Sequence, residues 1–271
     1  MFNYNIVVLY YLSIIWGSYS VGVRPVFSGD ELRSEGAFLM ANHQTMADCN
    51  IIFFVANKMK KLNSLKWFVK SSIRFLPGVG FALHFLDVIF VKRNWTQDKR
   101  TIERTFANLK KSKIKPVIVI FPEGTRQTAK KFKEARAFTV SRNMEPLRHL
   151  MHPRPRGFVA TVTNMRDSLD SVVDVTIGFP EQGLPSLWQW FQGIGAKNTC
   201  IHCRRFPIAD LPLDDEEALK RWLFGRFKEK DELLDRLYRT GSFEEGAGKE
   251  RVDLETAESG RKGYGGNKVT P

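Results

Sequence analysis

The sequence predicts an α/β fold in which helices flank a mostly parallel central sheet. Short apolar runs rich in β-branched residues alternate along the chain with longer amphipathic segments, and this alternation is typical of such sheets. The 271 residues, 43% of them hydrophobic, suffice for one large domain with a sizeable core. An uncharged N-terminal stretch adds a membrane-associated helix to this expectation.

The N-terminal stretch, residues 1–23, contains no charged side chain, and residues 6–16 are almost wholly apolar. A helix over the whole stretch would be about 34 Å long, enough to cross a hydrocarbon core of about 30 Å. Serines and glycines in its second half leave two alternatives open, a spanning helix and a helix embedded in one leaflet. We therefore expect a membrane helix at 1–23, one large folded domain at 24–243, and a Gly-rich, charged and disordered tail at 244–271.

Seven strands and four helices are expected between the N-terminal stretch and the tail. Apolar, β-branched runs predict strands at residues 38–41, 66–70, 88–92, 117–121, 157–162, 173–179 and 199–208. Helices are predicted at residues 45–59, 96–111, 134–142 and 216–238. The last of these helices carries an apolar stripe at helical spacing, which indicates a packing face.

His43 and Asp48 form a candidate catalytic pair between the strand at 38–41 and the helix at 45–59. Five residues on one continuous helix turn about 500°, so the two side chains meet only if His43 precedes the helix. Asn42 as N-cap would place it there. An Asp in the first turn can then accept a hydrogen bond from one imidazole nitrogen and leave the other free as a general base. Taken alone, His43 fits an ordinary loop histidine equally well.

A second candidate site lies at Phe121-Pro122-Glu123-Gly124-Thr125-Arg126, directly after the apolar run 117–120. In an open α/β sheet, ligands bind beyond the carboxyl ends of the strands. The Arg126 guanidinium can donate two parallel hydrogen bonds to a phosphate, and Thr125 and the Gly124 N–H add neutral donors. The alternative is an ordinary turn in which Glu and Arg pair with each other. A base and an anion site in one chain favour the catalytic interpretation.

These segments carry a family resemblance. NHQTMAD, residues 42–48, is similar to the NHxxxxD block of the glycerolipid acyltransferases, and IFPEGTR, residues 120–126, resembles their FPEGTR block. DVIFVKR, residues 87–93, resembles the intermediate block, an apolar strand that ends in a substrate-binding Arg, here Arg93. Segments at 150–158, 169–180, 204–208 and 238–243 extend the similarity to the branch that contains lysocardiolipin acyltransferase and the membrane-bound 1-acylglycerol-3-phosphate acyltransferases.

The resemblance implies an acyl-CoA-dependent O-acyltransferase that esterifies the free hydroxyl of a lysophospholipid, foremost 1-acylglycerol-3-phosphate (lysophosphatidic acid). Lysocardiolipin and lysophosphatidylinositol are the alternative acceptors. The catalytic residues would be His43 and Asp48. The residues implied to bind the acceptor are Arg93, Glu123, Gly124, Thr125 and Arg126. Acyl-CoA would be a co-substrate, no cofactor or metal is expected, and the enzyme would sit on a membrane with its active site facing the cytosol, in a eukaryote the endoplasmic reticulum.

The net charge of +13 also fits a non-catalytic module that binds lipid or nucleic acid. The lysine clusters accompany no zinc-finger spacing or RNA-recognition motif, and basic residues beside apolar segments fit an anionic membrane surface. A serine esterase is disfavoured because the chain has no G-x-S-x-G segment. Cys200 and Cys203 flank a histidine without a second ligand pair, so we expect no zinc and a reducing, cytosol-facing compartment.

Overall fold

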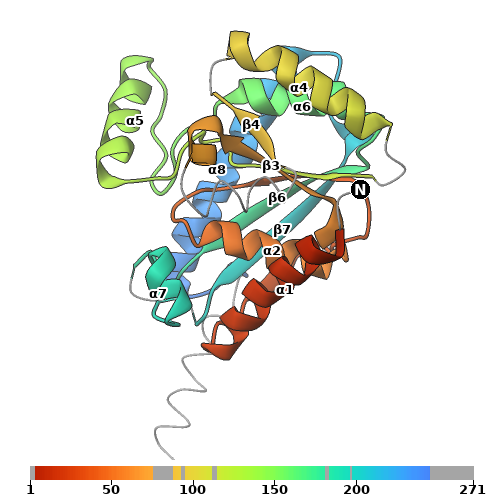
Figure 1. Cartoon of the computed structure of the whole chain (residues 1–271). Helices are drawn as coiled ribbons and strands as arrows, with labels where there is room; N and C mark the ends of the chain where they lie inside the picture. Colours follow the sequence, from red (N-terminus) through yellow and green to blue (C-terminus); the bar gives the residue numbers. More distant parts are fainter. Residues whose placement is uncertain are drawn as a thin grey trace, which may run out of the picture.

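A seven-stranded sheet runs through the centre of the molecule (Figure 1). The computed structural model describes residues 4–75, 88–92, 95–111, 115–180, 183–195 and 197–244. In chain order the strands are β1 (Val26–Gly29), β2 (Ala37–Ala41), β3 (Leu65–Lys70), β4 (Ile89–Val91), β5 (Val117–Ile120), β6 (Ser171–Gly178) and β7 (Cys200–Pro207). They lie in the order β1-β7-β6-β2-β5-β3-β4, and every neighbouring pair is parallel except β6 and β7. The predicted α/β class with a mostly parallel sheet is therefore confirmed.

Helices cover both faces of the sheet (Figure 1). One face carries α1 (Tyr4–Ser20), α2 (Asp48–Lys58) and α7 (Leu187–Phe191), and the other carries α4 (Trp95–Lys110), α6 (Pro155–Met165) and α8 (Glu216–Thr240). The helix α5 (Ala129–Ser141) stands off from the sheet. Three short 3-10 helices lie at Leu62–Ser64, Ser71–Phe75 and Ile208–Asp210.

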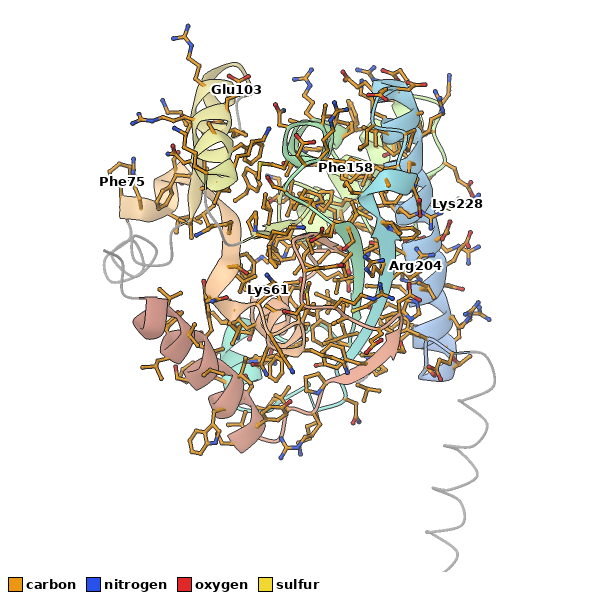
Figure 2. The ribbon with its side chains drawn as sticks, turned by 90° about the vertical axis from the view of Figure 1, so that its right-hand side faces the viewer. Lys61, Phe75, Glu103, Phe158, Arg204 and Lys228 are labelled. Atoms are coloured by element: carbon orange, nitrogen blue, oxygen red, sulfur yellow. The ribbon has the colours of Figure 1, made fainter. Side chains whose placement is uncertain are left out.

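The two faces of the sheet bury two separate cores. In β2, Leu39 and Ala41 join the core beneath α1 and α2, whereas Phe38 and Met40 join the core beneath α4, α6 and α8. Successive side chains of a strand point to opposite faces, so a central strand covered on both sides is apolar throughout. In the second core Phe158 of α6 stacks on Trp222 of α8, with ring centroids 5.5 Å apart (Figure 2).

One predicted strand is wrong. Residues 157–162 belong to the helix α6, although their two valines and one threonine favour a strand by propensity. The buried side chains Phe158, Val159, Val162 and Met165 recur at helical spacing, and Pro155 occupies the first turn, where its missing N–H costs nothing. Amphipathic packing against α8 thus outweighs β propensity in this segment.

Two further details differ from the expectation. The short strand β1 was not predicted, because the four residues Val26–Gly29 end in a Ser and a Gly and give no clear apolar alternation. The helix α2 begins at Asp48, and Asn42 is not its N-cap. Instead the Asn42 side chain lies beside β6, where its amide donates to the Ile177 carbonyl and its oxygen accepts from the Ile177 N–H, both at 2.8 Å. Asn42 therefore extends the sheet ladder beyond the end of β2.

The N-terminal stretch forms a helix that packs on the domain. Tyr11 and Ile15 of α1 are buried, and the Tyr11 ring lies 4.5 Å from that of Phe53 in α2. Near the end of α1, the Trp190 indole N–H donates to the Ser18 hydroxyl at 3.0 Å. Within the part of the chain that the structure describes, no helix is both long and apolar enough to cross a membrane. The predicted ligand Arg93 and the predicted tail, apart from residue 244, lie outside the described residues.

Candidate active site

The site begins with a hydrogen-bonded pair between His43 and Asp48. His43 follows β2, Asp48 opens α2, and the imidazole Nδ1 lies 3.1 Å from Asp48 Oδ2. The Thr45 N–H donates to the same oxygen at 2.8 Å. Because a carboxylate only accepts, Nδ1 carries the proton and Nε2 is left as the basic nitrogen. Burial raises the pKa of the Asp48 carboxyl, and the hydrogen bonds from His43 and Thr45 act against that rise.

An aromatic side chain fixes the plane of the imidazole. The Phe121 ring stacks on His43 with centroids 4.1 Å apart and an interplanar angle of 19°. Trp67 of β3 lies behind Phe121 at 6.3 Å between centroids. The His43 side chain is only 12% exposed, so most of the ring is packed against its neighbours. Packing and the bond to Asp48 together leave the ring little freedom to rotate.

Glu123 joins three segments of chain at the base of the site. One carboxyl oxygen accepts the His43 N–H at 2.7 Å, and the other accepts the Met151 N–H at 3.3 Å. The residue is 2% exposed, and burial raises the pKa of its carboxyl to about 7. Both Glu123 and Arg126 are described, and no ion pair links them, so the alternative of a simple paired turn does not apply. The geometry gives Glu123 a positioning role towards the backbone of His43.

The other residues of the loop at 121–126, which was predicted to bind an anion, flank Glu123 in the chain. Gly124 has φ +73°, a conformation that suits glycine and lets the chain turn tightly after Glu123. The Thr125 hydroxyl accepts from the Lys131 ammonium at 2.5 Å, and Arg126 is exposed. Lys131 was not predicted as part of the site. It lies six positions after Thr125, and their contact can be expected only once α5 is known to begin between them, at Ala129.

Pairing of β2 with β5 brings the two motifs together. These parallel neighbours align Met40 with Ile120, so His43 and Glu123 follow two adjacent carboxyl ends. Beyond the loop, the Gln127 N–H donates to the His43 carbonyl at 2.9 Å. His43 is thus held through its N–H, its carbonyl and its ring, and the predicted pair and the predicted loop form one site at one sheet edge.

Residues of α8 also reach the site, which the sequence did not predict. The Tyr238 hydroxyl donates to the Gln44 side-chain oxygen at 3.3 Å, and Gln44 lies between His43 and Asp48 in the sequence. The Asn42 amide lies 3.4 Å from the same oxygen. Tyr238 falls in a segment that the family resemblance covers, but nothing in its local sequence connects it with residues almost 200 positions earlier.

Comparison with known proteins now identifies the family. A family model described as Acyltransferase matches residues 24–179, more than half of the chain, and one described as Acyltransferase C-terminus matches residues 189–257. The chain belongs to the acyltransferase family. The first match contains His43, Asp48 and the loop at 121–126, and the second contains α8. The predicted resemblance is therefore confirmed.

This acyltransferase has similar relatives in plants, fungi and animals. It is 33% identical to the probable 1-acyl-sn-glycerol-3-phosphate acyltransferase 5 of Arabidopsis thaliana, with 84% of this chain and 60% of the relative aligned. It is 31% identical to the mouse 1-acyl-sn-glycerol-3-phosphate acyltransferase delta, over 78% of this chain and 55% of the relative. An uncharacterized acyltransferase of Schizosaccharomyces pombe is 30% identical, over 79% and 63%. The chain thus spans about three fifths of the length of these relatives.

The fold of this acyltransferase is also found in a solved structure. The crystal structure of the 1-acyl-sn-glycerophosphate acyltransferase PlsC from Thermotoga maritima superposes with a TM-score of 0.52. The match covers 83% of this chain and 79% of that chain at 15% sequence identity. The likeness shows a shared α/β fold.

Proposed function

We propose that this acyltransferase transfers an acyl chain from acyl-CoA to the free hydroxyl of a lysophospholipid, with lysophosphatidic acid as the acceptor. The proposal rests on two hydrogen bonds that join the His43–Asp48 pair to the loop at 121–126. The His43 N–H donates to Glu123, and the Gln127 N–H donates to the His43 carbonyl. A base and a phosphate-binding loop at one sheet edge suit an acceptor that carries both a hydroxyl and a phosphate. The names of the Arabidopsis and mouse relatives, both 1-acyl-sn-glycerol-3-phosphate acyltransferases, support this choice of acceptor.

In the proposed mechanism, Nε2 of His43 removes the proton of the acceptor hydroxyl while its oxygen attacks the thioester carbonyl. The new C–O bond forms, the C–S bond breaks, and the CoA thiolate takes the proton from the imidazolium. Asp48 orients the ring and stabilises its positive charge. No covalent acyl-enzyme is formed. Fixing the hydroxyl beside the carbonyl raises its effective molarity above that of competing water.

The anion loop holds the acceptor phosphate in this proposal. Arg126 supplies a bidentate donor and the Thr125 hydroxyl a neutral one. Gly124 contributes through the turn, because its N–H already donates to the Phe121 carbonyl at 2.9 Å. Arg93 is assigned to the same phosphate from the family resemblance. Glu123 does not need to touch the substrate, because both its oxygens accept backbone N–H groups. Its contribution is to set the distance between the base and the phosphate loop.

We infer that the enzyme works on a membrane surface. The face of α1 opposite Tyr11 and Ile15 exposes large apolar side chains, with Leu9 64% and Trp16 76% accessible. The neighbouring helix α7 exposes Trp188 to 71%. A helix that is apolar around its whole circumference indicates a second apolar environment beyond the protein core, and a lipid leaflet supplies it. The free cysteines support a domain on the cytosolic side.

Acyl transfer by the purified full-length chain tests the function. Radiolabelled acyl-CoA is offered with lysophosphatidic acid in mixed vesicles, and the product is resolved by chromatography. His43→Ala should lower the turnover about 10²- to 10⁴-fold while the protein stays folded, because general-base catalysis contributes about that much. Asp48→Asn should also be severely impaired. The double variant should be little worse than His43→Ala, because the two residues act as a unit.

Parallel assays distinguish the remaining alternatives. Higher kcat/KM with lysocardiolipin or lysophosphatidylinositol would change the acceptor but keep the mechanism. Vesicle binding without transfer to any of the three lipids would indicate a non-catalytic lipid-binding module. A well-folded His43→Ala protein with normal turnover would remove His43 from the mechanism.

A further inference from the structure

We propose that Arg154 is a substrate-phosphate ligand that completes the anion site from a distant segment of the chain. The proposal rests on the proposed function and assigns a residue outside the two motifs. Arg154 lies three residues after Met151 and directly before Pro155, the first residue of α6. It is 28 positions after Arg126, yet the fold lays it on the loop at 121–126.

The contact is made at Gly124, where there is no side chain to obstruct it. A Cβ built on Gly124 would come within 2.9 Å of Arg154 Cδ, 3.3 Å of its Nε and 3.6 Å of its Cζ. The guanidinium therefore lies against the backbone of the loop at Gly124. The Arg154 N–H also donates to the Pro122 carbonyl at 2.7 Å, which fixes its backbone against the same loop. Position 124 therefore favours glycine for two reasons, the positive φ and the close approach of the Arg154 side chain.

The segment that carries Arg154 is held firmly by two buried acids. Asp231 of α8, only 6% exposed, accepts the backbone N–H groups of Arg148, His149 and Leu150 at 2.8, 2.8 and 3.1 Å. The next N–H, that of Met151, is accepted by Glu123. A fixed backbone leaves only the side-chain rotamers of Arg154 to be ordered when it binds an anion. The backbone placement of Arg154 is therefore set in advance by both halves of the fold.

The charge of Arg154 is not neutralised within the described part of the protein. Its side chain is exposed, and among the described residues it forms no ion pair with an acid. The acid closest to it in the loop, Glu123, is buried and directs both oxygens to backbone donors. Arg126 in the same loop is likewise exposed and without an acidic partner in the described chain. Arg154, which contacts Gly124, and Arg126, two residues further along the same loop, thus offer two guanidiniums without acidic partners in the described chain to a dianionic phosphate.

Two substrates could supply that phosphate, the phosphomonoester of the lysophospholipid and the phosphates of CoA. The contact with Gly124 favours the phosphomonoester, because this glycine belongs to the loop next to His43. Calorimetric titration with two unreactive probes, glycerol 3-phosphate and CoA, distinguishes the sources without any turnover. The variants are Arg154→Ala, Arg154→Lys and the matched control Arg156→Ala. Arg156 is also exposed, but it lines a separate pocket of about 430 Å³ with Val159 and Leu213.

Arg154→Ala should weaken binding of glycerol 3-phosphate about 10- to 100-fold, the range expected for a charge-assisted hydrogen bond. Arg154→Lys should restore part of the affinity, since an ammonium keeps the charge but loses the planar fork. Arg156→Ala should leave both affinities unchanged. A loss of affinity confined to CoA would mean that Arg154 binds a phosphate of the acyl donor instead. Unchanged affinity for both probes, or no binding of either probe by the unmodified protein, would overturn the proposal. If phosphate binding falls as expected but the unmodified enzyme transfers no acyl group, the phosphate site stands and the proposed reaction fails.

Discussion

At the scale of single residues, the site depends on side chains that bind backbone groups. Glu123 joins the loops after β2 and β5 to Met151, and Asp231 holds the three residues that precede Met151. A buried carboxyl is costly unless it is hydrogen-bonded, so each of these acids also specifies which backbone segments must meet around it. The precision of the His43 position comes from Glu123 as much as from Asp48.

The raised pKa of Glu123 predicts a pH dependence of stability. Burial shifts the pKa from an ordinary 4.5 to about 7 in the folded protein. Between these values the unfolded chain has lost the proton and the folded chain keeps it, so the free energy of unfolding falls as pH rises, by about 3 kcal/mol in all. The contribution is fully present below pH 4.5 and is lost as pH rises through about 7.

Urea unfolding of the unmodified protein and of Glu123→Gln at pH 5 and pH 8 measures this contribution. The glutamine has no proton to lose, so the difference in unfolding free energy between the two proteins should change with pH. Parallel pH profiles would mean that Glu123 keeps an ordinary pKa in the folded protein.

At the scale of elements, α1 has two apolar faces with different partners. Tyr11 and Ile15 pack into the core with α2, while Leu9 and Trp16 point away from it. The exposed face agrees with the proposed contact with a leaflet, and the buried face explains why α1 stays on the domain. A substitution on the exposed face should therefore affect membrane binding, and one on the buried face should affect stability.

Trp16→Ser and Ile15→Ala test the two faces of α1. Trp16→Ser should weaken binding to anionic vesicles about tenfold or more and leave the melting temperature nearly unchanged, because the side chain is 76% exposed in the free protein. Ile15→Ala should instead destabilise the domain by about 2–5 kcal/mol, as expected for a side chain that is 5% exposed. Vesicle sedimentation and thermal melting supply the two measurements. Normal sedimentation of the Trp16 variant would argue against the lipid-facing role of this helix.

At the scale of the whole molecule, α8 links the two matched family segments into one domain. Its buried side chains Leu219, Leu223, Phe227, Leu234 and Leu237 cover one face of the sheet. Arg204 of β7 bonds to Glu229 of α8 and to Asp174 of β6, between the sheet and that helix (Figure 2). In the interior, the Lys230 ammonium lies 2.6 Å from Asp174. Tyr238 and Asp231 of the same helix bind residues at the sheet edge that carries His43, so we expect the first segment to depend on the C-terminal one.

This dependence predicts different outcomes for two shortened chains. A chain that ends after Asp214 lacks α8, exposes the apolar face beneath it and loses the Asp231 carboxyl, so we expect no cooperative thermal unfolding and no acyl transfer. A chain that ends after Glu244 keeps every described contact of α8 and should melt and react like the full-length protein. Differential scanning calorimetry with the acyl-transfer assay compares the two. A cooperative transition in the shorter chain would show that the first segment folds alone.

The sequence alone determined the fold class, six of the seven strands and the two motifs. Those features depend on local patterns: an apolar run buried on both faces, a turn after it, and polar residues at its carboxyl end. Parallel pairing brings such ends to one edge, so the sequence places His43 and the loop at 121–126 on the same edge of the sheet. Their direct contact depends on β2 and β5 being neighbours, which the sequence does not show. The acidic residue in the first turn of α2 was also predictable, because the spacing from His43 requires it.

Only the tertiary structure decided the rest. Whether residues 157–162 formed a strand or a helix depended on the packing of α6 against α8, since their β-branched residues and their helical spacing predict opposite states. The roles of Glu123, Asp231 and Asn42 consist of hydrogen bonds to backbone groups, and every residue type except proline offers the same N–H and C=O. Arg154 reaches Gly124 across 30 positions because Asp231 and Glu123 fix the segment between them. Such long-range placements depend on the strand order and on helix docking, which local sequence patterns do not encode.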